Sequence, residues 1–195
     1  LEKNATPSHP NHIARKRSMP LPIVTSVRAI NRKGSIVISK TDSVRIEAKL
    51  SDNKGVRGLK LEYFYDNLEK EGETKVQQEM TLSSGVWEHT LPKKTDRTLV
   101  RYRLLADFGK GSEIISPRPS DPYKWHAYFV MPRSTGSNRY FELMVPRAGT
   151  SQLAKNMSAN PRSGYRPARN VKPRGPWNDT VDGILVHEGV VRDVH

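Results

Sequence analysis

The sequence predicts an all-β protein, an antiparallel β-sandwich followed by a largely irregular basic extension. Between residues 22 and 132, about eight or nine short apolar runs recur roughly every 8–12 residues, with turn signals between them. No window keeps apolar residues at helical spacing over the length of a helix. After Pro132 the composition changes, and basic residues and prolines become frequent.

The run at 98–107 is expected to be the central strand. Its apolar and polar residues alternate, with Val100, Tyr102 and Leu104 on one face and two arginines on the other. Such alternation is typical of a strand with one buried face and one solvated face. We therefore expect Tyr102, and with it Trp87, in the core.

The other predicted strands follow in chain order, and those at 43–52 and 59–66 alternate in the same way. They are the runs at 22–30, 35–39, 43–52, 59–66, 75–82, 86–92, 112–117 and 124–132. The run at 75–82 is polar, which predicts an edge strand. The tripeptide Asp-Phe-Gly at 107–109 matches a protein-kinase motif, but the other kinase motifs are missing from the sequence around it. We assign it to a hairpin turn.

Composition limits the possible functions. The 195 residues carry a formal net charge of +13, only 35% are hydrophobic, and the mean hydropathy is −0.69. This basic balance favours anionic partners such as nucleic acid, phosphates, teichoic acid or anionic membranes, although solubility alone explains it more simply. Without cysteine, a disulfide framework, a cysteine zinc site and a thiol nucleophile are all excluded. No apolar run approaches the roughly 18 residues needed to span a bilayer.

Both ends of the sequence are informative. Residues 1–21 are polar and proline-rich, carry the basic cluster at 15–17 and lack the apolar segment of a signal peptide, so we expect a linker or disordered arm. The chain starts at Leu1 and stops inside a predicted strand. It is therefore expected to be an internal fragment of a larger protein.

The region 133–195 is expected to differ from the preceding domain. It contains a strand at 139–146, a basic loop at 147–178 and a hairpin at 182–195. Within the loop only 149–159 is suited to a short helix, with Thr150 or Ser151 as its N-cap. The hairpin turns at Glu188 and Gly189, and no other strand is expected to extend it into a sheet.

Two resemblances add to this prediction. The runs LKLEYFYD, GVWEHTLP, LVRYRLLADFGKG and HAYFV, in this order, resemble a fibronectin type III or immunoglobulin-like (Ig-like) module, as in bacterial extracellular repeats, over 43–131. The succession YFVMP, YFELMVP and GILVHEGVVRDV is similar to the passage from such a module into a spore-coat CotH-type kinase domain. The second resemblance implies ATP and a divalent metal as cofactors of the parent protein. The kinase residues of that family lie farther on, so none is assigned in this chain.

The candidate binding residues are basic. In the segment 147–178, Arg162, Arg166, Arg169, Lys172 and Arg174 are interleaved with Tyr165 and Trp177. Arginines beside aromatic rings can hold phosphates and stack on bases, so these five residues are possible anion contacts. A basic loop near the ATP site of a kinase-like domain and an insertion packed against a partner are the alternatives.

No catalytic, cofactor or metal residue is assigned. His187 and Glu188 lack the second histidine of a zinc helix, and the glutamates at 69, 71 and 73 lack the aspartates of a calcium loop. A Ser-His-Asp set is not evident from the sequence.

The function expected from these observations is a non-catalytic Ig-like structural, adhesion or spacer module of a larger secreted or surface bacterial protein. Its partners would be neighbouring domains of the same polypeptide, another protein or a cell-surface polymer, rather than nucleic acid, and no segment is expected to span a membrane. The alternatives are the N-terminal part of a CotH-type kinase whose ATP site lies beyond the chain end, and anion or nucleic-acid binding through 147–178.

Overall fold

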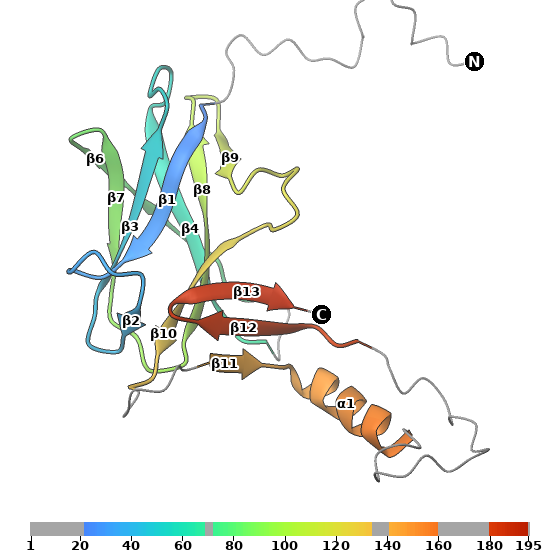
Figure 1. Cartoon of the computed structure of the whole chain (residues 1–195). Coiled ribbons are helices and arrows are strands. Elements are labelled where there is room, and N and C mark those ends of the chain that lie inside the picture. The colour runs from blue at the N-terminus through green and yellow to red at the C-terminus, as the bar shows by residue number, and fades with distance from the viewer. Residues whose placement is uncertain (1–21, 69–71, 134–140, 160–179, 195) are drawn as a thin grey trace, which may run out of the picture.

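The computed structural model describes residues 22–68, 72–133, 141–159 and 180–194. Over these residues the protein is mainly β, with antiparallel sheets and one helix, as Figure 1 shows. The strands are β1 (Val24–Ile30), β2 (Ile38–Ser39), β3 (Val44–Leu50), β4 (Gly58–Asp66), β5 (Val76–Glu79), β6 (Thr81–Ser83), β7 (Val86–Leu91), β8 (Leu99–Asp107), β9 (Ser112–Ser116), β10 (His126–Met131), β11 (Phe141–Met144), β12 (Gly183–His187) and β13 (Val190–Val194). The helix α1 spans Arg147–Ala159. The predicted mainly-β class is confirmed.

Three sheets organise these strands. The first has the order β1-β3-β7-β6, the second has the order β2-β10-β8-β4-β5 with β9 also paired to β8, and the third has the order β11-β12-β13. All pairs are antiparallel except the short β2–β10 pair. The predicted strand at 35–39 is thus reduced to Ile38 and Ser39, because only these two residues reach β10.

The four-stranded and six-stranded sheets share one apolar core. Its members come from the inward positions of both sheets, and the fully buried ones include Ile46, Leu59, Leu61, Val100, Leu104 and Tyr128. Trp87 and Tyr102 also lie in this core, with 7% and 3% of their surface exposed. Both core predictions are confirmed.

Strand β8 is the central strand, as expected. One of its edges pairs with β4 along the whole length, from Leu99↔Asp66 to Asp107↔Gly58. Its other edge is shared, since β10 pairs with its first half and β9 with its second half. The residues 108–111 connect β8 to β9, so the Asp-Phe-Gly tripeptide does lie in a hairpin turn.

The predicted edge position of the segment 75–82 is confirmed, but the prediction of one continuous strand is wrong. The segment forms two short strands, of which β5 pairs with β4 in one sheet and β6 pairs with β7 in the other. Met80 lies between them and is 5% exposed. Met80 lies between the polar residues Glu79 and Thr81, and its side chain is buried in the core that the two sheets share. The chain passes from one sheet to the other at this residue.

The short helix considered at 149–159 within the predicted basic loop does form, and it begins two residues earlier, at Arg147–Ala159. The helix begins ahead of the predicted caps, directly after Pro146, and proline suits the start of a helix since its amide hydrogen is not needed there. Thr150 instead donates its hydroxyl to the Pro146 carbonyl at 3.1 Å. No helix in the described part of the chain is long and apolar enough to cross a membrane.

The hairpin at the C-terminal end forms as predicted, but it does have a partner strand. Strand β11 pairs with β12 from Phe141↔His187 to Met144↔Ile184. The turn residues Glu188 and Gly189 have φ values of 49° and 81°, as a two-residue hairpin requires. The extension is therefore more regular than expected over 141–159 and 180–194.

Candidate functional site: a groove where three sheets meet

The third sheet packs on the outer face of the six-stranded sheet, which the sequence predicted to be solvated. Leu99, Phe129 and Met131 project from β8 and β10 and form one cluster with Ile184 and Val186 of β12. Phe129 and Val186 are fully buried. The alternating pattern of β8 does not predict that this face is covered, because the strands that cover it are far away in the sequence.

Arg101 anchors the same junction. Its guanidinium lies between Asp66 of β4 and Asp193 of β13, with Nε 3.0 Å from Asp66 Oδ2 and Nη2 2.6 Å from Asp193 Oδ1. Burial alone would lower the pKa of Arg101, but its hydrogen bonds to Asp193 and Asp66 outweigh that effect and the pKa is raised. A second ion pair, between Arg97 Nε and Glu142 Oε1 at 3.0 Å, joins β11 to the turn before β8.

The tip of the C-terminal hairpin touches the loop between β1 and β2. A Cβ atom at Gly189 would lie 2.5 Å from the carbonyl oxygen of Ile36. Only glycine allows this approach, and only glycine adopts the left-handed φ of 81° without strain. The hairpin is thus held at its tip as well as along its length.

Gly189→Ala is expected to destabilise the protein by about 1–3 kcal/mol, through backbone strain and the clash with Ile36. Gly85→Ala is the matched control, because Gly85 has a φ of 80° and open space around its Cβ position. Urea unfolding should therefore show a larger loss for Gly189→Ala than for Gly85→Ala. Equal losses would show that the tip does not dock.

A groove with a volume of about 970 Å³ runs along this junction. Residues 27–29 of β1, residues 126–128 of β10 and residues 189–194 of the hairpin line it. Each of these sets is a run of consecutive residues. Because consecutive strand residues point to opposite faces, the groove is bordered by strand edges rather than by a single face of a sheet.

His126 lies in this groove and makes a contact that the sequence did not indicate. Its Nε2 is 2.8 Å from Ser116 Oγ, and its ring centroid lies 5.4 Å from that of Tyr102, with the two rings tilted by 35°. Burial lowers the pKa of His126, and the nearby charge of Asp121 opposes the shift. Ser116 is only 8% exposed, and the Asp121 carboxylate accepts a hydrogen bond from the Arg118 amide. The pair therefore joins β9 to β10 rather than presenting a nucleophile.

The lowered pKa of His126 predicts that acid destabilises the fold. The unfolded chain binds a proton at His126 more readily than the folded chain does. The stability that neutral His126 contributes is therefore fully present above about pH 6.5 and is lost as the pH falls below this value. Urea unfolding at pH 7.5 and pH 5 measures the effect. His126→Gln should show a smaller difference between the two pH values, and an unchanged difference would contradict the assignment.

Tyr128 places a polar atom in the core. Its hydroxyl is buried and has no hydrogen-bond partner among the described residues. Burial raises the pKa of this tyrosine, as it does for Tyr102. Tyr128→Phe removes an unsatisfied hydroxyl and is expected to leave stability unchanged or raise it by up to about 1 kcal/mol in thermal or urea unfolding. A loss above about 1 kcal/mol would mean that the hydroxyl has a partner in solution.

The loop 117–125 forms one wall of the groove and is tied down by its own polar groups. Lys124 Nζ donates to the carbonyls of Pro119 and Asp121, each at 2.7 Å. This loop presents Tyr123, which is 58% exposed and also borders a second groove of about 650 Å³. Trp125 is held more firmly, with the Arg103 guanidinium 4.2 Å from its ring centroid.

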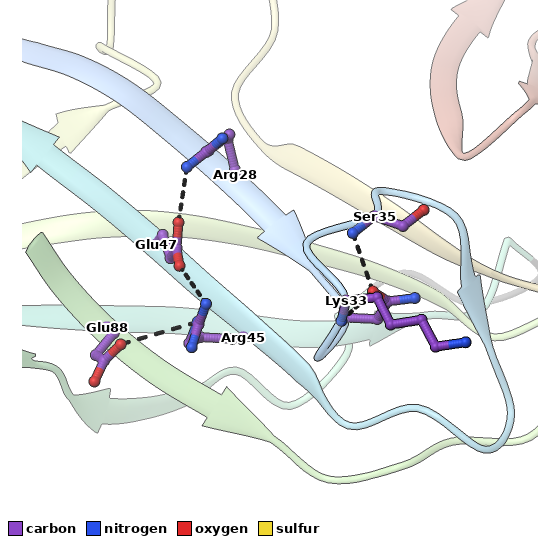
Figure 2. A network of polar contacts seen from close by, with 7 residues as sticks. Arg28, Lys33, Ser35, Arg45, Glu47 and Glu88 are labelled. Carbon is purple, nitrogen blue, oxygen red and sulfur yellow. Dashed lines mark hydrogen bonds and ion pairs between the residues drawn. The ribbon is translucent and has the colours of Figure 1, made fainter.

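Four charged side chains from β1, β3 and β7 form a network on the outer face of the four-stranded sheet. Figure 2 shows Arg28 and Arg45 on either side of Glu47, at 3.0 and 2.8 Å, with Glu88 3.9 Å beyond Arg45. In the adjoining loop the amides of Lys33 and Ser35 both donate to Asn31 Oδ1. These contacts fix β1 and the loop against which the hairpin tip rests.

Of the candidate site residues considered from the sequence, the described His187 and Glu188 do not line this groove. The five candidate anion contacts, Arg162, Arg166, Arg169, Lys172 and Arg174, lie outside the described residues, as do Glu69 and Glu71. His187 stacks on Phe141 at 4.2 Å and lies 3.8 Å from Glu188. Within the described ranges no three His, Asp or Glu side chains gather as a metal site would require.

Comparisons with known proteins give no further guide. No protein-family model matches the chain, and no curated protein or solved structure is significantly similar to it.

Proposed function

We propose that this chain is a non-catalytic structural module of a larger secreted or surface bacterial protein. Residues 22–132 would form an Ig-like β-sandwich, and residues 133–195 would begin a CotH-like kinase domain that the sandwich holds in a fixed orientation. Its partners would be neighbouring domains of the same polypeptide, with adhesion to a protein or cell-surface polymer as a further role.

The observation that carries this proposal is the junction between the sheets. Apolar packing at Phe129, the two carboxylates on Arg101 and the close approach at Gly189 all join the third sheet to the preceding domain. A flexible linker would need none of these contacts. Their combination supports a role in orienting whatever domain the third sheet belongs to.

Nuclear magnetic resonance relaxation of backbone amides tests the fixed orientation. Amides in β12 and β13 are expected to report the same rotational correlation time as amides in β3 and β4. Independent tumbling of the third sheet would overturn the proposal. Incubation of the chain with labelled ATP, Mg²⁺ and casein tests the second part, and phosphate transfer above background would contradict a non-catalytic role.

One observation supports the alternative hypothesis that the chain is part of a CotH-type kinase. The strand at 139–146 and the hairpin at 182–195, which carry the CotH resemblance, lie in one sheet as β11, β12 and β13. Under this alternative the chain is the N-terminal part of a kinase, with ATP and metal bound by residues beyond it. A longer version of the chain that transfers phosphate, when this chain does not, would support it.

A further inference from the structure

One end of the two larger sheets carries a strongly cationic surface, which we call the basic end. It is formed by the loops 31–37, 40–43 and 92–98 and by the residues 132–133 after β10, at the lower end of the two sheets in Figure 1. The cationic side chains of these segments are Arg32, Lys33, Lys40, Lys93, Lys94, Arg97 and Arg133, and the carboxylates are Asp42 and Asp96.

Contacts between the loops hold these charges on a common scaffold. Asn31 Nδ2 lies 3.5 Å from Asp42 Oδ2, which joins the first loop to the second. Lys40 Nζ lies 3.3 Å from Asp96 Oδ2, which joins the second loop to the third. The next amide along the chain donates to a β10 carbonyl at 2.8 Å. The segments of the basic end are thus connected to one another.

Four of the cations are available to a ligand. The other three are held by groups of the protein itself, Lys40 by Asp96, Arg97 by Glu142 and Lys94 by the ring of Tyr65. The four available cations are exposed and form no ion pair with a described carboxylate, and they are Arg32, Lys33, Lys93 and Arg133.

The carboxylates at and around this end are engaged elsewhere. Asp42 Oδ2 accepts hydrogen bonds from the amide and the hydroxyl of Ser39, at 2.9 and 2.8 Å. On the adjoining elements, Glu188 at the hairpin tip lies 3.8 Å from His187. Glu73 lines the second groove, beyond β4 in the six-stranded sheet. A net positive charge therefore remains at the basic end.

The residue types of the basic end select the ligand. Cations spread over several loops suit a linear polyanion with charges along its length. The four segments contain no aromatic residue, so nucleic-acid bases would find no ring on which to stack. The exposed apolar residues of these loops are Ile36 and Val37, and their backbone lies against Gly189 of the hairpin tip. These observations favour contact with phosphates alone.

We propose that the basic end binds a linear phosphodiester polymer without bases, a polyol phosphate, with Arg32, Lys33, Lys93 and Arg133 on its phosphates. Because the loops are joined to one another, binding orders mainly side chains, which keeps its entropic cost low. The proposal deepens the adhesion role proposed above and rests on it. Its failure would leave the fixed orientation of the third sheet untouched, since relaxation of the β12 and β13 amides tests that separately.

Fluorescence anisotropy of this chain with a labelled twelve-unit glycerol phosphate oligomer tests the proposal. Four phosphate contacts predict a slope of about −3 in a plot of log affinity against log salt, so affinity should fall about 50-fold between about 50 and 200 mM salt. A twelve-residue thymidine oligonucleotide should bind no more than about threefold tighter, because no stacking adds to the phosphate contacts. A salt loss below about threefold would overturn the proposal.

Two double variants locate the site. Lys33→Glu with Lys93→Glu should lose at least about tenfold in affinity, and Lys33→Gln with Lys93→Gln should halve the salt slope while leaving the circular dichroism spectrum unchanged. Lys54→Glu with Lys110→Glu makes the same charge change on exposed lysines at the opposite end of the sheets and should bind as the unmodified chain does.

Four outcomes would overturn the proposal. They are an absence of binding to the glycerol phosphate oligomer, an equal loss in both charge-reversal variants, and binding of the thymidine oligonucleotide at least about tenfold tighter than the oligomer, which would indicate recognition of bases. The fourth is binding to vesicles of phosphatidylcholine and phosphatidylglycerol at a ratio of about 4:1 without binding to the oligomer, which would indicate a membrane surface.

Discussion

Trp87→Ala is expected to destabilise the protein by about 3–5 kcal/mol, the usual loss for a large aromatic residue removed from a core. Trp87 is 7% exposed, lies opposite Ala48 on the neighbouring strand and packs in the core shared by the two larger sheets. Its ring Nε1 also donates a hydrogen bond to Asn53 Oδ1 at 2.8 Å. The substitution would leave both a cavity and an unsatisfied amide.

Urea unfolding followed by circular dichroism measures this loss. Ile23→Ala is the matched control, because Ile23 is 56% exposed and its truncation should cost no more than about 0.5 kcal/mol. Asn53→Ala separates the hydrogen bond from the packing and should account for about 1 kcal/mol. A loss below about 1 kcal/mol for Trp87→Ala would show that the ring is not packed as described.

Arg101→Ala is expected to cost about 2–4 kcal/mol, because it leaves Asp66 and Asp193 without their common cation. Asp66 is 15% exposed and Asp193 is 33% exposed. Water can therefore relieve Asp193 in part, which keeps the expected loss below that of a fully buried pair. Hydrogen exchange should increase more in β12 and β13 than in β3, since the third sheet depends on this contact.

The control replaces all three charges together. Arg101→Met combined with Asp66→Asn and Asp193→Asn removes the cation and both carboxylates, and it should recover most of the loss because no buried charge remains unpaired. Should Arg101→Ala destabilise β3 and β13 to the same extent, the arginine would support the whole domain rather than the junction.

The alternation of apolar and polar residues, together with apolar runs bounded by turn signals, predicted most strands of the shared core. In β8 the inward positions of Val100, Tyr102 and Leu104 follow directly from it, since a strand has a period of two residues. It also predicted the hairpin turn at Glu188 and Gly189, where the glycine permits a positive φ. These features depend on residues close together in the sequence.

The groove depends on residues far apart, and the sequence does not indicate it. Arg101 and Asp193 are 92 positions apart, and nothing in either local pattern marks them as partners. The hydrogen bond between Ser116 and His126 spans only ten positions, but the proline-rich loop between them has no regular pattern from which this contact could be predicted. An arginine on the outer face of a predicted central strand was the one available signal, because a charge at the centre of a sheet needs a partner when that face is covered.

The passage of the chain at Met80 has a mechanical consequence. Strands β5 and β6 are separated by this single buried residue, yet they belong to different sheets. Because Met80 is buried in the core that the two sheets share, separating the sheets would expose this side chain to water. A load that parts the two layers is therefore expected to work against the burial of Met80 as well as against the rest of the shared core.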